Sequence, residues 1–168
     1  MSDNVKLEVL GVFAPTVDYN KSLDDLADYC NQQYELISAG NEEAATFELL
    51  ILANALSFIN FSSEICNVGL SFEDKKITYL EKALDILCEN AKEFQMEEEE
   101  FNNIVKLASC FLCCLIIKNI GGNFITTNIG VGVHVGTKDI VIYDKIVSRL
   151  LNGRDAEIIT FYNNLKNN

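Results

Sequence analysis

The single histidine and the six cysteines have the side chains best suited to catalysis in this sequence. His134 is the one general-base candidate whose ordinary pKa lies near neutrality. A nucleophile such as Cys110 would have to come from another element of the fold to meet it. Because no spacing brings the two together, we expect a solvated or backbone-bonded histidine. A small enzyme or ligand-binding domain with its site around His134 is the alternative.

Two of the cysteines have the spacing of a metal or redox motif, Cys110-x-x-Cys113. Zinc would need two further ligands, and the sequence has neither a second C-x-x-C nor a second histidine. A redox pair needs a helix N-terminus to lower the thiol pKa, whereas this pair lies within a long apolar stripe. We therefore expect these thiols to pack in the core, and we assign no metal ligand.

Three glycines, Gly130, Gly132 and Gly136, have a spacing that resembles a dinucleotide-binding turn. Such a turn must lead into a helix whose N-terminus holds the pyrophosphate, but the strand-like DIVIY follows here. Glycine inside a strand more often marks a close approach of neighbouring backbone. The prediction is a strand whose glycine face is packed closely, with no cofactor.

Carboxylates form two local groups, which we expect on solvated helix faces or first turns and not in apolar pockets. The group members are Asp24, Asp25 and Asp28, and Glu97, Glu98, Glu99 and Glu100. We assign none of them a catalytic role. Their common field would attract a cationic protein surface, so these seven residues are the candidate partner-binding residues.

The negative charge is concentrated in the first two thirds of the chain. Residues 1–117 carry 21 acidic and 7 basic side chains, whereas residues 118–168 carry 4 acidic and 6 basic ones, and the 168-residue chain has a net charge of −12. This field disfavours binding to nucleic acid or to an anionic membrane. The sequence shows no secretory signal, and its most apolar run, CFLCCLII, has eight residues. We expect a single cytoplasmic domain over residues 1–168.

Periodicity predicts an α+β fold, in which about four main helices pack on a small antiparallel sheet near the C-terminus, followed by short helices. The pattern predicts helices at 22–39 and 41–59, a loop at 60–70, and two antiparallel helices between 71 and 121 with a break near 94–97. The helix at 41–59 is apolar on most sides and is expected at the centre of the helices. In the segment after residue 71, Glu81 is predicted on the solvent side of its helix and Phe94 in the apolar stripe. Strands are predicted at 5–9, 124–127, 131–135 and 140–143, with the strand at 5–9 half-buried. Ser22, Asn41, Asp144 and Asp155 are predicted helix caps.

The last fifty residues suggest a family. The order KNIGGNF (118–124), glycine-rich strands, IYDKIVSRLLNG (142–153) and EIITFY (157–162) is similar to the C-terminal part of small bacterial proteins of unknown function. Some of those proteins accompany secreted toxins as immunity proteins. Phe124 stands where that group would have a tryptophan. The resemblance implies a protein without catalytic machinery that binds another protein.

These observations favour a non-catalytic acidic module that binds another protein. If it is of the immunity type, it would inhibit a basic partner or toxin. A site around His134 remains the enzymatic alternative. A homo-oligomeric structural protein is a third hypothesis, which requires an exposed apolar patch.

Overall fold

The computed structural model describes residues 5–168 and has an α+β architecture, which confirms the predicted fold class. Within this range it contains six α-helices and one four-stranded antiparallel sheet. The helices are α1 (Leu23–Ser38), α2 (Phe47–Cys66), α3 (Ile77–Glu93), α4 (Glu98–Asn119), α5 (Ile142–Asn152) and α6 (Ile158–Asn167). The strands are β1 (Val9–Phe13), β2 (Asn123–Thr127), β3 (Val131–Val135) and β4 (Lys138–Val141).

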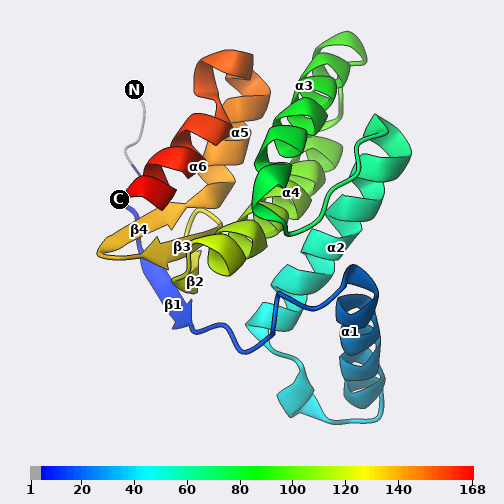
Figure 1. Cartoon of the computed structure of the whole chain (residues 1–168). Coiled ribbons are helices and arrows are strands. Elements are labelled where there is room, and N and C mark those ends of the chain that lie inside the picture. The colour runs from blue at the N-terminus through cyan, green and yellow to red at the C-terminus, as the bar shows by residue number, and fades with distance from the viewer. Residues whose placement is uncertain (1–4) are drawn as a thin grey trace.

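Helix α4 lies at the centre of the fold (Figure 1). It packs against α2 on one side and against α5, β2 and β3 on the other. Every residue from 108 to 117 is buried, because neighbours surround this part of the helix on all sides. The sequence pattern had indicated the helix at 41–59 as the central one. The structure places α2 beside the centre instead, with Leu50 exposed.

The N-terminal strand joins the three C-terminal strands, so the sheet has the order β1-β2-β3-β4 (Figure 1). Strand β1 covers residues 9–13 and not 5–9, because its partner β2 pairs with this segment, from Val9 opposite Thr127 to Phe13 opposite Phe124. The expected half-burial of the segment 5–9 is wrong. Val5 is 66 % exposed, because residues 5–8 precede the paired strand, and the backbone of Lys6 and Glu8 hydrogen-bonds to Asn128 in the turn after β2.

The helix break predicted near residues 94–97 is confirmed, since α3 ends at Glu93 and α4 begins at Glu98. The loop predicted at 60–70 is wrong in its first half, because α2 continues to Cys66. Phe58, Ser62 and Cys66 are all buried at four-residue spacing, so tertiary packing holds the polar turn helical. Asn67 then ends the helix with a left-handed backbone, φ 53°.

Three predicted caps differ from the observed ones. Asn41 caps the short 3₁₀ turn Glu42–Ala44, and Thr46 caps α2. Helix α5 begins at Ile142, directly after β4, which places Asp144 within its first turn. Asp155 lies in the 3₁₀ turn Gly153–Ala156, and α6 begins only at Ile158. Ser22 does cap α1, by accepting a hydrogen bond from the Asp25 amide.

Two helices, α2 and α4, are long and apolar enough to cross a membrane by length and composition alone. The sequence analysis counted only uninterrupted apolar runs and found none long enough to span a membrane, so that expectation is revised. Isolated polar residues interrupt the apolar runs of α2 and α4, but the mean hydropathy of each helix stays as high as that of a spanning helix. Most of α4 is buried among other elements of the fold, as the core helices of soluble proteins are.

Candidate functional site

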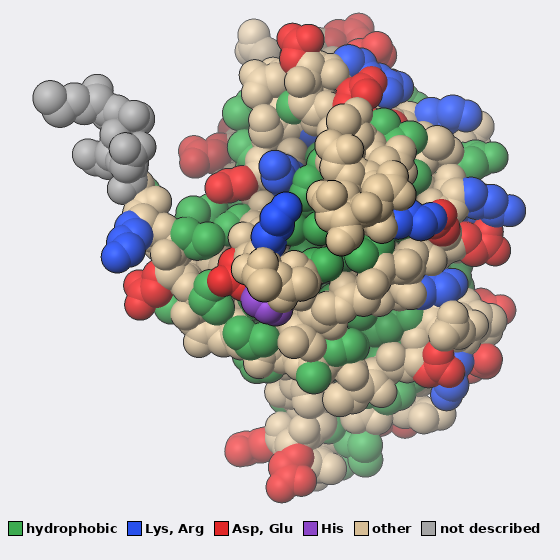
Figure 2. Space-filling view, turned by 60° about the vertical axis from the view of Figure 1, so that its left-hand side comes forward, with side chains coloured by type: hydrophobic (Ala, Val, Ile, Leu, Met, Phe, Trp, Pro, Cys, Tyr) green, Lys and Arg blue, Asp and Glu red, His purple; other side chains and the backbone are tan. Residues whose placement is uncertain are grey.

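His134 lies on β3 directly opposite Asp139 on β4. Its Nδ1 is 2.6 Å from Asp139 Oδ1, and the two side chains are 36 % and 40 % exposed. The histidine therefore has a carboxylate within hydrogen-bond reach, which the enzymatic hypothesis requires. It lines none of the five hollows identified among the described residues, and Figure 2 shows the single histidine at the molecular surface. All six thiols are buried in the core, so no cysteine completes a catalytic pair with it.

The glycine-rich strands are closely packed, as the sequence predicts. A Cβ atom at Gly132 would lie 2.1 Å from the carbonyl oxygen of Ile140, and one at Gly130 would lie 2.6 Å from the Cβ of Tyr143. Strand β4 follows Gly136 in the chain, so these residues lack the order strand, glycine turn, helix of a dinucleotide-binding turn. The glycines allow neighbouring chain to approach closely.

The C-x-x-C cysteines lie in the most deeply buried part of α4. Cys113 and Cys114 are 0 % exposed and Cys110 is 1 % exposed. Burial raises the pKa of the Cys110 thiol to about 11 and raises those of Cys113 and Cys114 well above their usual range. These thiols are neutral packing groups at physiological pH.

The seven carboxylates of the candidate partner-binding surface are all exposed, but they do not form one site. Asp24, Asp25 and Asp28 lie on the first turns of α1, and Glu97–Glu100 lie at the start of α4. Figure 1 shows α1 at the lower end of the helical layer, whereas α4 begins near the upper end. The structure therefore separates two acidic groups that the sequence treated as one field.

An apolar hollow lies beside the second of these groups. Its volume is about 420 Å³, and it is formed where the C-terminal ends of α2 and α3 meet the start of α4. We call it the α3–α4 hollow and define it by Phe61, Ile65, Phe94, Met96, Glu97 and Glu100, which are among its lining residues. Phe94 is 72 % exposed and Ile65 is 57 % exposed, so large apolar side chains face solvent here. An apolar surface with a carboxylate rim is the result.

The four glutamates Glu97–Glu100 carry more negative charge than is needed to offset the dipole at the N-terminus of α4. A helix N-terminus carries roughly half a positive elementary charge, which a single carboxylate offsets. None of Glu97–Glu100 forms a side-chain ion pair with any residue in the described range 5–168. Most of this negative charge is therefore directed to solvent, where a cationic group can reach it.

A second hollow, of about 530 Å³, lies on the other side of the same helical turns. Glu99, Asn102 and Lys106 line it from α4, and Tyr143 lines it from α5. The first two turns of α4 thus stand between two surface depressions. A partner that covered this end of the helix could contact both.

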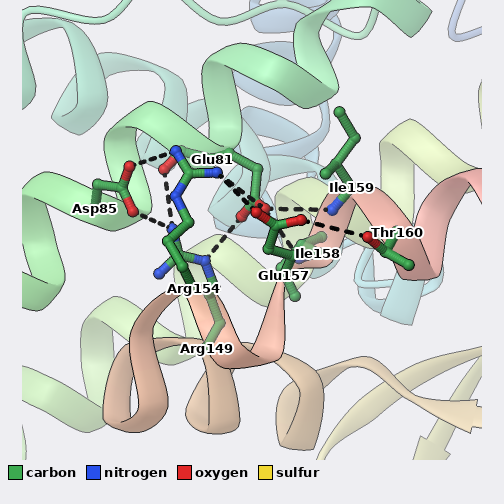
Figure 3. Close-up of polar contacts among 8 residues, drawn as sticks. All are labelled: Glu81, Asp85, Arg149, Arg154, Glu157, Ile158, Ile159 and Thr160. Carbon is green, nitrogen blue, oxygen red and sulfur yellow. Dashed lines mark hydrogen bonds and ion pairs between the residues drawn. The ribbon is translucent and has the colours of Figure 1, made fainter.

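A buried charge network fastens the C-terminal helices to α3 (Figure 3). Arg149 of α5 is fully buried, and its Nε donates a hydrogen bond of 2.9 Å to Oε1 of Glu81, which is 2 % exposed. The other oxygen of Glu81 accepts from the backbone amides of Ile158 and Ile159 and thereby caps α6. The sequence pattern had placed Glu81 on the solvent side of its helix, so that interpretation is wrong.

Asp85, one turn further along α3, connects this network to the surface. It accepts hydrogen bonds from Arg149 Nη2 and from Arg154 Nη2, the latter at 2.5 Å. Desolvation opposes ionisation of Asp85, but the two guanidinium groups outweigh it and hold the pKa of this carboxyl below its usual value. Arg149 Nη1 has no hydrogen-bond partner within residues 5–168. The network is a structural clamp, since each charge faces an opposite charge and its buried members, Glu81 and Arg149, line none of the five hollows.

A second buried carboxylate was also missed by the sequence analysis. Glu48 of α2 is 5 % exposed and accepts hydrogen bonds from the Thr16 amide, the Thr16 hydroxyl and the Tyr19 hydroxyl. Burial is the main reason that the pKa of Tyr19 is raised far above its usual value. Glu48 therefore anchors the connection between β1 and α1. A glutamate in the first turn of an apolar helix was the only sequence signal.

Neither a protein-family model, nor a curated protein, nor a solved structure matches this chain.

Proposed function

We propose that the protein is a non-catalytic binding module that docks a basic protein at the α3–α4 hollow. The observation that carries this proposal is the combination at one depression of exposed Phe94 and Ile65 with the carboxylates of Glu97 and Glu100, which form no ion pair within residues 5–168. Aromatic and aliphatic side chains buried at the centre of an interface provide most of its affinity, and charged rims provide orientation and rate.

The chemistry of the hollow favours a partner segment with two features. An apolar side chain of the partner fills the depression against Phe94, and flanking Lys or Arg side chains meet the glutamates of α4. The acidic side chains Asp24, Asp25 and Asp28 act at longer range, because they share the sign of the field but lie at the other end of the helical layer. They accelerate encounter and do not hold the complex together.

The last fifty residues resemble small bacterial proteins of unknown function, some of which are immunity proteins, and this resemblance supports one form of the proposed function. In that form the basic partner is a secreted enzyme toxin, and the module inhibits it by covering its active site. Cytoplasmic localisation fits the same proposal, because an immunity protein meets its toxin inside the cell. Catalysis at His134 has less support, since its pair with Asp139 lies on an exposed hairpin.

The test begins with affinity purification of the tagged protein from its own cells at low salt, with mass spectrometry of the retained proteins. We expect a stoichiometric basic protein that is released as salt rises from about 50 mM to about 500 mM, because exposed charges are screened in this range. The purified partner is then used to compare three variants by surface plasmon resonance.

The variants separate docking from a general charge effect. The double variant Glu97→Lys and Glu100→Lys should weaken binding at least about tenfold, and Phe94→Ser should accelerate dissociation. The matched control, Asp24→Lys with Asp28→Lys, changes the net charge equally and should mainly slow association. Equal losses of affinity in both double variants would contradict docking at the hollow, as would wild-type affinity in the Phe94 variant.

A further inference from the structure

The exposed apolar side chains of this protein are concentrated at its first strand. Six of the thirteen large apolar residues that are exposed in the described part lie within residues 5–13. They are Val5, Leu7, Val9, Leu10, Val12 and Phe13. Figure 2 shows hydrophobic side chains at the surface beside the described N-terminal end. This concentration is independent of the α3–α4 hollow.

Strand β1 is also an edge of the sheet. It pairs with β2 on one side, and no other strand of residues 5–168 pairs with its second side. A strand in this position presents unpaired backbone amide and carbonyl groups, which can pair with another extended chain. Apolar side chains of β1 are exposed on both faces of the strand, so they can contact a paired chain above and below this row of backbone groups.

The opposite edge of the same sheet provides a comparison. Strand β4 has four residues, begins with the exposed charged pair Lys138 and Asp139, and leads directly into α5. Short length and charge are the usual means by which edge strands avoid pairing. Strand β1 has the sequence VLGVF, without a charge or a proline. Of the two edges, β1 alone combines a free row of backbone groups with an apolar surface.

We propose that the free edge of β1 binds an extended, apolar and basic segment of another protein by strand addition. In this arrangement, backbone hydrogen bonds to β1 provide affinity, and alternate side chains of the segment lie on opposite faces. One set contacts Val12 on the face opposite Phe13. The other set contacts Phe13, whose ring lies 4.7 Å from that of Phe47 on α2. Basic residues at its ends complement the net charge of −12.

Three observations favour a separate segment over a second copy of this chain. Pairing of two β1 strands would join only five residues from each copy, whereas a stable interface uses roughly 20–30 residues a side. Each copy carries a charge of −12, so the two molecules repel. The register of β1 shifts between Val9 and Gly11, so a ladder between two copies would be interrupted at the same bulge in each strand. A flexible segment can adapt to the bulge.

The experiment uses a phage-displayed library of random peptides selected on the immobilised full-length protein. We expect enrichment of sequences with alternating β-branched or aromatic residues and with Lys or Arg at their ends. The most enriched peptide is synthesised with a fluorescent label, and its affinity is measured by anisotropy. Hydrogen exchange should show increased protection of the amides in residues 9–13 when the peptide is bound.

Charge at the exposed strand positions tests where the peptide binds. Val12→Lys should weaken binding at least about tenfold, because an uncompensated charge at a paired edge opposes strand addition. Leu151→Lys is the matched control, since Leu151 is 60 % exposed and Val12 is 55 % exposed, and it should bind within about twofold of wild type. Circular dichroism checks that both variants remain folded. The Glu97→Lys and Glu100→Lys variant should also retain peptide binding, which separates this edge from the α3–α4 hollow.

Three outcomes would overturn the proposal. The first is a selection without enrichment. The second is a peptide whose binding or protection does not depend on Val12. The third is a concentration-dependent dimer in analytical ultracentrifugation that Val12→Lys dissociates, because the edge would then belong to a second copy.

Discussion

Replacement of Glu81 by glutamine should cost about 3 kcal/mol of unfolding free energy. The carboxylate of Glu81 is almost fully buried and has two tasks, to pair with Arg149 Nε and to accept from the amides of Ile158 and Ile159. Glutamine has nearly the same shape, so no cavity is formed. Its amide nitrogen must nevertheless face either the guanidinium group or the N-terminus of α6, and both are hydrogen-bond donors.

The magnitude follows from the environment of Arg149. Removal of one member of a buried ion pair costs about 3–5 kcal/mol, because the remaining charge is left buried without compensation. Asp85 still contacts Arg149 in the variant, so we take the lower end of that range. For a chain of this size, about 3 kcal/mol corresponds to a decrease in melting temperature of roughly 6–12 °C.

Urea unfolding followed by circular dichroism at neutral pH measures this effect. Glu89→Gln is the matched control, since Glu89 is an exposed glutamate on the same helix, and its effect should be within about 0.5 kcal/mol. A double variant, Glu81→Leu with Arg149→Met, should be more stable than Glu81→Gln, because it leaves no buried charge of this pair unpaired. A loss below about 1 kcal/mol for Glu81→Gln would refute the interpretation of the network as a clamp.

Three further predictions concern other parts of the molecule. Two arginines hold the folded-state pKa of Asp85 below 3.8, so the stabilising contribution of this carboxylate is present above about pH 4 and is lost as the pH falls through the folded-state pKa. Urea midpoints measured between about pH 2 and pH 6 should therefore depend less on pH in the Asp85→Asn variant than in wild type. Gly132→Ala should lower the free energy of unfolding by about 1–3 kcal/mol, because the new Cβ would lie 2.1 Å from a backbone carbonyl oxygen. Gly69→Ala is the control, since no atom would lie within 4 Å of its new Cβ, and it should be nearly neutral in the same urea unfolding measurement. The six cysteines are buried in the native state, so a thiol reagent such as Ellman's reagent should label them only as the protein unfolds, and rapid labelling of the folded protein would contradict their burial.

Local sequence patterns predicted much of the fold. The Ser22 cap, the break at 94–97, and the three C-terminal strands to within about two residues depend on interactions between residues that are close in the chain. The burial of Cys110 and Cys113 followed from their position in an apolar stripe. The exposure of Glu97–Glu100 followed in the same way from their place on a first turn.

The candidate site was only partly visible in the sequence. The four glutamates were identified, but the apolar hollow beside them was not. Ile65 was placed in a loop, and it reaches the hollow because α2 continues as far as Cys66. Phe94 was identified as part of an apolar stripe, and it is exposed because it lies just beyond the end of α3. The hollow forms because the ends of three helices lie close together, and the sequence of any one of these segments does not show this.

The sequence by itself determined the α+β class, the distribution of charge and the boundaries of most elements, because periodicity and capping act over a few residues. Only the tertiary structure decided that β1 is an exposed edge and that Glu81 is a buried cap for a helix 77 residues away. The physical reason is the same in both cases. The environment of a strand edge or of a carboxylate depends on which distant segment packs against it, and that partner leaves no periodic signal in the local sequence.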